Sequence, residues 1–292
     1  MSDRTSGDLA ADLDRLGLKQ SSLVMVHSSL RSIGRVADGA ATVVDALLSA
    51  LGPQGTLIVP TFTGQFRDPG FIFDPAETPC TTGAIPNDAF RRPSARRTYH
   101  LVQTVAAIGP LADEITLAGG NDGWDAQPSM RALFDLDGWF LLLGVPYQNL
   151  TAGHFLEQEL STHRRARALS GLMRQPDGTV VPLRSKVFGP DPNFPGMPER
   201  SYDFNRLGQG LEARGLVNRG PVGNAVARLF RAQDLATTAQ DMFRADKDLF
   251  FKAGGQVTSL SYGHTWEIPS GRNSGAELCV IDPAGVYMPR IE

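Results

Sequence analysis

Three continuous apolar segments, each the length of a buried β-strand, constrain the fold of this chain more than any other feature. They are SLVMVH at residues 22–27, TLIVP at 56–60 and WFLLLGV at 139–145. Between the first two, residues 41–51 carry apolar side chains at the spacing of one helix face. A strand, a helix and a second strand at this spacing form a βαβ unit, which implies parallel pairing and a right-handed crossover. The sequence therefore predicts an α/β protein.

An antiparallel hairpin is predicted further along the chain. Residues 169–174 and 179–187 flank Pro176-Asp177-Gly178, which is a strong turn signal. From the spacing of apolar residues we also expect helices at residues 7–16, 151–161, 203–214, 222–230 and 234–244, and strands at 257–262 and 277–281.

The charge balance excludes several classes of protein. The 292 residues hold 28 lysines and arginines against 31 acids, a formal charge of −3. A near-neutral chain lacks the positive charge of a dedicated nucleic-acid binder and does not favour attachment to a membrane by charge. No segment approaches the roughly 18 apolar residues of a membrane span, and the first 20 residues contain no signal-peptide core. We therefore expect a cytoplasmic protein that binds neither nucleic acid nor membrane.

Common catalytic signatures are absent from the sequence. It contains no G-x-G-x-x-G, no Walker loop, no G-x-S-x-G and no H-E-x-x-H. A Rossmann dehydrogenase, a P-loop enzyme and a hydrolase with a nucleophile elbow are therefore disfavoured.

Small and hydroxyl-bearing residues follow the first apolar segment. Ser28 and Ser29 lead through Gly34 and Gly39 into the helix at 41–51. The free backbone N–H groups of such a loop, next to a helix N-terminus, suit a phosphate or pyrophosphate. The alternative is purely structural, because many loops between a strand and a helix carry Ser and Gly only to turn the chain.

A second candidate site follows the WFLLLGV segment. His154 and Glu157 stand at i and i+3 of the expected helix and so share one face. A carboxylate beside an imidazole fixes its tautomer and raises its basicity, as a general base requires. The end of a buried parallel strand is also where α/β sheets bind ligands. Two alternatives stay open: a solvated pair on the helix surface, and a zinc site with His163, whose spacing fits no standard pattern.

Charged residues are segregated along the chain. Four arginines cluster at residues 91–97, whereas residues 113–137 contain six acids and one base. A cationic rim could meet phosphates, and an acidic one could meet a substrate that carries amines. Solvated protein faces are the alternative explanation for both clusters.

Five segments together resemble the aminoglycoside 3-N-acetyltransferase family, which is distinct from the GNAT acetyltransferases. In chain order they are VHSSLRSIGRV, GTLIVPTF, TTGAIPNDAFRR, RTYHLVQTVAAIG and LLLGVPYQNLTAGHFLEQE. The resemblance covers roughly residues 8–245. It implies an α/β fold, which we expect to be a three-layer α/β/α sandwich with a mixed, largely parallel central sheet and an antiparallel hairpin.

The resemblance also implies acetyl-CoA-dependent N-acetylation of an amine, with no metal. By that likeness Ser28, Ser29, Leu30, Val36 and Thr104 bind the cofactor. His154 takes the proton of the attacking amine, and Glu157 orients the imidazole and balances its charge. Asp203 lies on the acceptor side. Transfer is expected to be direct, from the thioester to the amine.

The sequence departs from the family pattern in ways that bear on the acceptor. Tyr202-Asp203-Phe204-Asn205 keeps one acid where paired acids are frequent, and Leu101 follows His100 where the family usually has proline. Fewer acids weaken the expectation of a polycationic aminoglycoside. The open alternatives are another amine from natural-product metabolism, a CoA-binding protein without turnover, and a zinc hydrolase.

The expected organisation is an acetyltransferase domain at residues 1–252 and an extension at 253–292 of unknown role, packed on that domain. A homodimer stays open at this stage, as does the identity of the acyl group.

Overall fold

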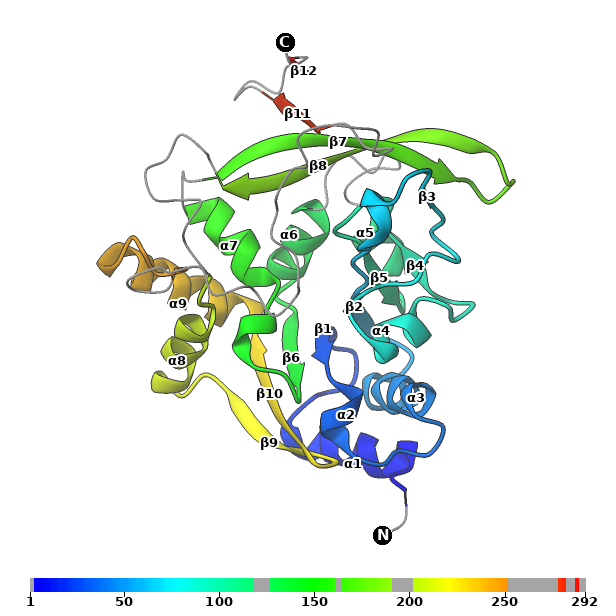
Figure 1. Ribbon diagram of the computed structural model, residues 1–292. Coiled ribbons are helices and arrows are strands. Elements are labelled where there is room, and N and C mark those ends of the chain that lie inside the picture. Colours follow the sequence, from blue (N-terminus) through cyan, green and yellow to red (C-terminus); the bar gives the residue numbers. More distant parts are fainter. Residues whose placement is uncertain are drawn as a thin grey trace.

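A mixed seven-stranded sheet forms the centre of the protein (Figure 1). A computed structural model describes residues 3–117, 127–160, 164–190, 202–251, 278–281 and 287–288. Within these ranges the strand order is β4-β5-β2-β1-β6-β10-β9. The strands are β1 (Leu23–Ser28), β2 (Thr56–Pro60), β4 (Arg96–Arg97), β5 (Val105–Ile108), β6 (Trp139–Leu143), β9 (Asn218–Val222) and β10 (Ala225–Arg231).

The three apolar segments of the sequence lie side by side in the middle of this sheet. Strand β1 pairs in parallel with β2 on one side and with β6 on the other. The outer strands pair with their neighbours in antiparallel fashion. Central strands are covered on both faces, which explains why their sequences are continuously apolar rather than alternating.

Helices cover both faces of the sheet, so the expected three-layer α/β/α sandwich is confirmed. One face packs against α1 (Ser6–Leu16), α2 (Leu30–Ile33), α3 (Ala40–Leu51) and α4 (Ala84–Ala89). The other packs against α5 (Ala112–Leu117), α6 (Gln127–Asp135), α7 (Ala152–Leu160), α8 (Asn205–Ala213) and α9 (Ala232–Ala245). Successive β1 residues alternate between the two layers: Val24 and Val26 face the first, and Met25 faces the second.

The predicted hairpin is confirmed as two long antiparallel strands, β7 (Arg164–Arg174) and β8 (Val180–Pro190). It arches over the end of the molecule opposite the N-terminus (Figure 1). The second sheet also contains β3 (Ile72–Phe73), β11 (Leu278–Ile281) and β12 (Tyr287–Met288). Two 3₁₀ turns complete the described elements, η1 (Gln65–Arg67) and η2 (Tyr147–Asn149).

The prediction of a helix at residues 222–230 is wrong. This segment forms the turn and second strand of the β9–β10 hairpin, and β10 then pairs with β6. Gly223 adopts a φ of +58°, which a helix interior does not accommodate and a tight turn does. Ala227 is buried while Val226 is exposed, the alternation of a strand. The expected strand at 257–262 lies outside the described residues.

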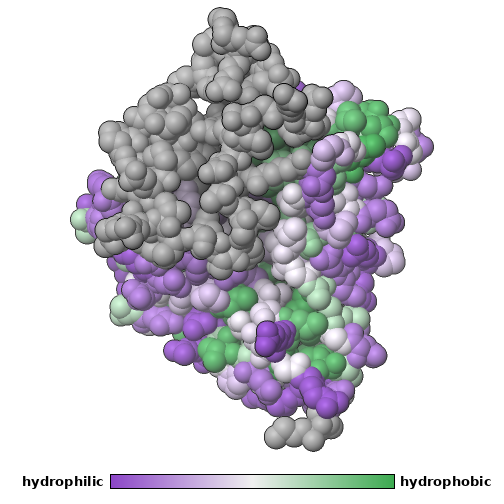
Figure 2. Space-filling model, in the orientation of Figure 1, coloured by the Kyte–Doolittle hydropathy of each residue, from purple (hydrophilic) through white to green (hydrophobic). Residues whose placement is uncertain are grey.

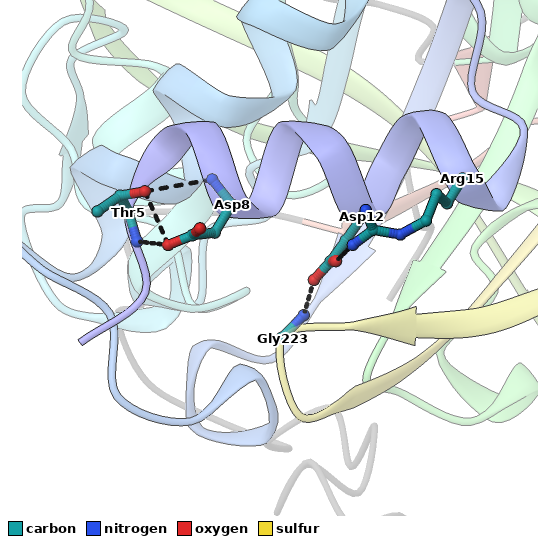
Figure 3. A network of polar contacts seen from close by, with 5 residues as sticks. All are labelled: Thr5, Asp8, Asp12, Arg15 and Gly223. Carbon is teal, nitrogen blue, oxygen red and sulfur yellow. Dashed lines mark hydrogen bonds and ion pairs between the residues drawn. The ribbon is translucent and has the colours of Figure 1, made fainter. Parts of the chain in front are cut away.

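Polar contacts fix helix α1 at its first turn and in its middle (Figure 3). Thr5 and Asp8 form a reciprocal capping box at its first turn. Further along, the buried Asp12 carboxylate forms an ion pair with Arg15 and accepts a hydrogen bond of 2.8 Å from the backbone N–H of Gly223. Asp12 therefore ties the first helix to the turn of the β9–β10 hairpin.

Replacing Asp12 with alanine is expected to destabilise the protein by about 1–3 kcal/mol, because the Gly223 amide would lose its acceptor in a part-buried position. Thermal unfolding measures the effect. The matched control is Asp14→Ala on the same helix, where the side chain is exposed and little change is expected. Equal melting temperatures for the two variants would contradict this role of Asp12.

Among the described helices, none combines the length and the apolar character needed to cross a membrane.

Candidate active site

The two candidate sites of the sequence meet at one edge of the sheet. Ser28 ends β1, and in the parallel register it pairs with Leu143, the last residue of β6. Helix α7, which follows β6, carries His154 in its first turn. Because parallel strands end at the same sheet edge, the loop after β1 and the start of α7 face the same region.

The loop after β1 is held to the end of β6 by hydrogen bonds. The backbone N–H of Ser29 donates to the Leu143 carbonyl at 3.0 Å. The Ser32 hydroxyl lies 2.9 Å from the Gly144 carbonyl and 3.0 Å from the Ser29 hydroxyl. A side chain on Gly144 would collide with Ser32, because its Cβ would lie only 2.5 Å from the Cβ of Ser32. The loop therefore needs glycine at this position to approach β6 so closely.

Three of the predicted cofactor residues present a hydroxyl and an apolar surface. The Ser28 hydroxyl is buried and has no hydrogen-bond partner in the described part of the chain. Leu30 and Val36 are half-buried and pack on the helical layer that contains α3. Figure 2 shows apolar surface in the lower part of the molecule, where α2 and α3 lie in Figure 1. These residues combine a free polar group with an apolar rim, as a long amphipathic ligand requires.

Aromatic rings hold the imidazole of His154. The rings of Tyr202 and Phe204 contact it edge-to-face at centroid distances of 4.7 Å each, with interplanar angles of 88° and 85°. Phe204 is buried and His154 is half-buried. Edge-to-face contacts of this kind fix the orientation of a ring. One turn further along α7, Glu157 is completely buried.

Behind this site, a second histidine contacts the beginning of α7. The ring of His27 on β1 is buried, and its Nε2 lies 3.2 Å from the backbone N of Thr151 and 2.9 Å from its hydroxyl. Burial lowers the pKa of His27 to about 4, so the ring is neutral at physiological pH.

The other two predicted site residues have their side chains engaged within the protein. Thr104 is fully buried, and its hydroxyl lies 2.9 Å from that of Thr61. The Asp203 carboxylate accepts hydrogen bonds from the backbone and side chain of Asn205, at 3.2 and 3.3 Å, at the start of α8. In the sequence, Asp203 nevertheless lies between Tyr202 and Phe204, the two aromatic residues that contact His154. A cofactor role for Thr104 and a substrate role for Asp203 stay predictions.

No group of three His, Cys, Asp or Glu side chains suited to a metal ion occurs within the described ranges. His163, the third ligand of the zinc alternative, lies outside them.

Sequence reasoning missed His27, Tyr202 and Phe204 as neighbours of the site. The last two belong to the motif YDFN, which the resemblance placed on the acceptor side through Asp203 alone, without a role for its aromatic residues. His27 and Thr151 are 124 positions apart. His27 ends the first apolar segment, and Thr151 follows the third. The parallel register of β1 and β6 was the available signal for that pair.

Comparison with known proteins identifies the family. The sequence profile of the aminoglycoside 3-N-acetyltransferases matches residues 25–244, most of the chain. The chain belongs to the aminoglycoside 3-N-acetyltransferase family. It is 31% identical to aminoglycoside N(3)-acetyltransferase IV of Salmonella sp over 254 residues, covering 83% of this chain and 88% of the relative. It is also 31% identical to aminoglycoside N(3)-acetyltransferase VII of Streptomyces paromomycinus, covering 78% of this chain and 87% of the relative.

Solved structures of aminoglycoside acetyltransferases share this fold. The apoenzyme of AAC(3)-IVa superposes with a TM-score of 0.69 at 28% identity, covering 87% of this chain and 93% of that one. A histidine-to-alanine mutant of AAC(3)-IVa, in complex with a gentamicin, superposes with a TM-score of 0.67 at 29% identity, covering 86% of this chain and 92% of that one. The protein is thus an acyltransferase by family, and the resemblance seen in the sequence is confirmed.

In this acetyltransferase, Gly153→Ala is expected to displace the ring that supports His154. A Cβ at Gly153 would lie 2.6 Å from ring carbons of the buried Phe204, which has little room to retreat. We expect a loss of about 1–3 kcal/mol in stability and about tenfold or more in kcat. Thermal melts and steady-state acetyl transfer measure the two effects. Gly7→Ala is the control, since its Cβ would have 3.8 Å of clearance in α1; unchanged values for both variants would contradict the expectation.

Proposed function

We propose that this chain is an acetyl-CoA-dependent N-acetyltransferase that transfers an acetyl group directly to an amine of an aminoglycoside antibiotic. The observation that carries the proposal is the placement of His154, one turn before the buried Glu157, at the same sheet edge as the Ser28–Leu30 loop. The names of its relatives support the class of acceptor.

The loop after β1 fits one part of the co-substrate. Acetyl-CoA supplies an activated acetyl thioester at the end of a long pantetheine arm. The buried Ser28 hydroxyl, without a partner in the described part of the chain, can bond a polar group of that arm. Leu30 and Val36 provide apolar contacts along it. The backbone N–H of Ser29 already donates to the Leu143 carbonyl. Ser29 therefore acts in this loop as the residue that precedes α2.

His154 is the general base of the proposed reaction. A protonated amine cannot attack a carbonyl, so the acceptor first loses its ammonium proton to solvent and reacts as the neutral amine, whose nitrogen must lose one further proton as the amide forms. The imidazole accepts that proton as the nitrogen bonds to the acetyl carbon, and the carbon–sulfur bond breaks with its electron pair leaving on the CoA sulfur. The proton held by His154 then neutralises the thiolate. The products are an amide and CoA thiol.

Glu157 stabilises the cationic ring that His154 becomes during transfer. Its carboxylate is withdrawn from water, where a charge acts more strongly on a neighbouring group than it does in solvent. The perpendicular contacts with the rings of Tyr202 and Phe204 keep the imidazole from turning away. The chain thereby supplies both a base and the means to hold it in position.

The test is CoA thiol release from acetyl-CoA with a panel of amines, followed by mass spectrometry of the product. The expected result is a mass increase of one acetyl group on an aminoglycoside. Turnover with other amines but with no aminoglycoside would replace this acceptor by one of natural-product metabolism. Binding of acetyl-CoA without turnover on any amine would overturn the enzymatic proposal.

A further inference from the structure

The contact between His27 on β1 and Thr151 at the start of α7 involves the backbone N–H of Thr151. This N–H determines the tautomer of the His27 ring. The N–H of Thr151 can only donate, so Nε2 of His27 must present its lone pair at 3.2 Å. The neutral ring therefore carries its hydrogen on Nδ1. The lowered pKa of His27 agrees with this, because a doubly protonated ring could not accept the bond.

The imidazole of His27 carries a cost in stability at this position. Its Nδ1 is buried and meets no hydrogen-bond acceptor among the described residues. An unsatisfied buried donor costs about 1–3 kcal/mol. An apolar side chain would avoid that cost, as Met25 does two residues earlier on the same face of β1. What the imidazole provides in return is its bond to Thr151.

Thr151 transmits that bond to the proposed base. It immediately precedes α7, and its carbonyl accepts the backbone N–H of His154 at 3.1 Å. The N–H of Thr151 is one of the helix-terminal donors that α7 cannot satisfy internally. One unbroken series of hydrogen bonds therefore runs from His27 through Thr151 to the backbone of His154. Ser28, next to His27, begins the proposed cofactor loop.

We propose that His27 is a positioning residue, which sets the first turn of α7, and with it His154, at a fixed distance from the loop that begins at Ser28. This rests on the proposed function for its catalytic consequence. His27 touches neither substrate in the proposed reaction; it acts through Thr151. Acetyl transfer depends on the separation of the base and the thioester, and a displacement of about 1 Å can reduce a rate by about 100-fold.

The experiment compares His27→Gln with His27→Asn. The glutamine amide oxygen can occupy the place of Nε2 and accept the Thr151 N–H, whereas asparagine reaches only the place of Nδ1. We expect His27→Asn to lower kcat by about 10- to 100-fold, and His27→Gln to stay within about threefold of the wild type. Isothermal titration should give similar acetyl-CoA affinities for all three proteins. The two amide variants have similar polarity, so a general loss of stability would affect both.

Amide hydrogen exchange of the peptide that spans Thr151 to Leu160 provides a readout independent of turnover. Exchange in the first turn of α7 should accelerate in His27→Asn and remain slow in His27→Gln. Equal kcat or equal exchange in the two variants would overturn the proposal. If the wild-type protein acetylates no amine, the proposed function fails, and the exchange rates alone then decide whether His27 holds α7.

Discussion

His154→Ala is expected to lower kcat for acetyl transfer by about 10²- to 10⁴-fold, the range that a positioned general base contributes. Acetyl-CoA affinity, measured by titration calorimetry, should stay within about threefold of the wild type, because the proposed cofactor loop lies on another element.

Glu157→Gln separates the roles of the two residues. Glutamine keeps the size of the buried side chain but removes its charge, so the imidazolium loses its stabilising partner while the imidazole stays in place. We expect a smaller loss in kcat, about 10- to 100-fold. Glu159→Gln on the same helix is the control, since Glu159 is exposed and pairs with Arg131 at the surface. A His154→Ala variant that retains its rate, or loses acetyl-CoA binding, would remove His154 from the role of base.

The centre of the fold was readable from the sequence because its signals are local. A buried parallel strand must be apolar on both faces, and β1, β2 and β6 each show this over five or six residues. Parallel strands also place their following loops at one edge. That rule alone brings Ser28 and His154 to the same edge of the sheet, although they lie far apart in the chain.

The β9–β10 hairpin could not be predicted from the same kind of signal. The segment Ala225–Arg231 has small and apolar residues that satisfy a helical period as well as an alternating one. What decides its structure is pairing with β6, with Leu229 opposite Leu141. Such pairing depends on a distant strand and leaves no trace in the local pattern. The aromatic contacts of His154 were hidden for the same reason.

The arginine cluster at residues 91–97 shows that charged residues adjacent in the sequence need not form one charged surface. In the sequence it resembles a cationic rim for phosphates. In the structure Arg92 bonds two aspartates and Arg96 bonds Asp113, while Arg97 points into the protein. Adjacent side chains on a strand face opposite sides, which separates Arg96 from Arg97 completely. Charge neighbours in the sequence therefore have different partners in space.

The structure assigns Arg97 a structural role that predicts the second large effect. Its guanidinium donates to the carbonyl oxygens of Thr61 at 2.9 Å and Thr78 at 2.6 Å, and to the Thr61 hydroxyl at 3.2 Å. It also stacks over the ring of Phe90 at 4.2 Å. The network includes Thr104, whose hydroxyl lies 3.4 Å from the guanidinium. Arg97 thus joins β4 to the chain that follows β2 and to the segment before β5.

Arg97→Met should destabilise the protein by about 3–5 kcal/mol, because several buried carbonyl groups lose their donor at once. For a chain of this size the melting temperature should fall by about 10 °C or more. Arg97→Lys should recover only part of the loss, since an ammonium group cannot reproduce the planar fork of a guanidinium. Arg96→Ala is the neighbouring control; its exposed ion pair with Asp113 should contribute less than about 1 kcal/mol.

The pH dependence of this loss distinguishes a carbonyl-bonded guanidinium from an ion pair. Burial lowers the pKa of Arg97 to about 10, so the folded protein releases this proton at lower pH than the unfolded chain does. The unfolded state therefore binds more protons than the folded state only above about pH 10, and the stability of the wild type gains from this group only as the pH rises above that value. Between about pH 5 and 9 both states keep the charge. The difference in unfolding free energy between wild type and Arg97→Met should then be constant, whereas dependence on a carboxylate partner would make it shrink as the pH falls toward about 4.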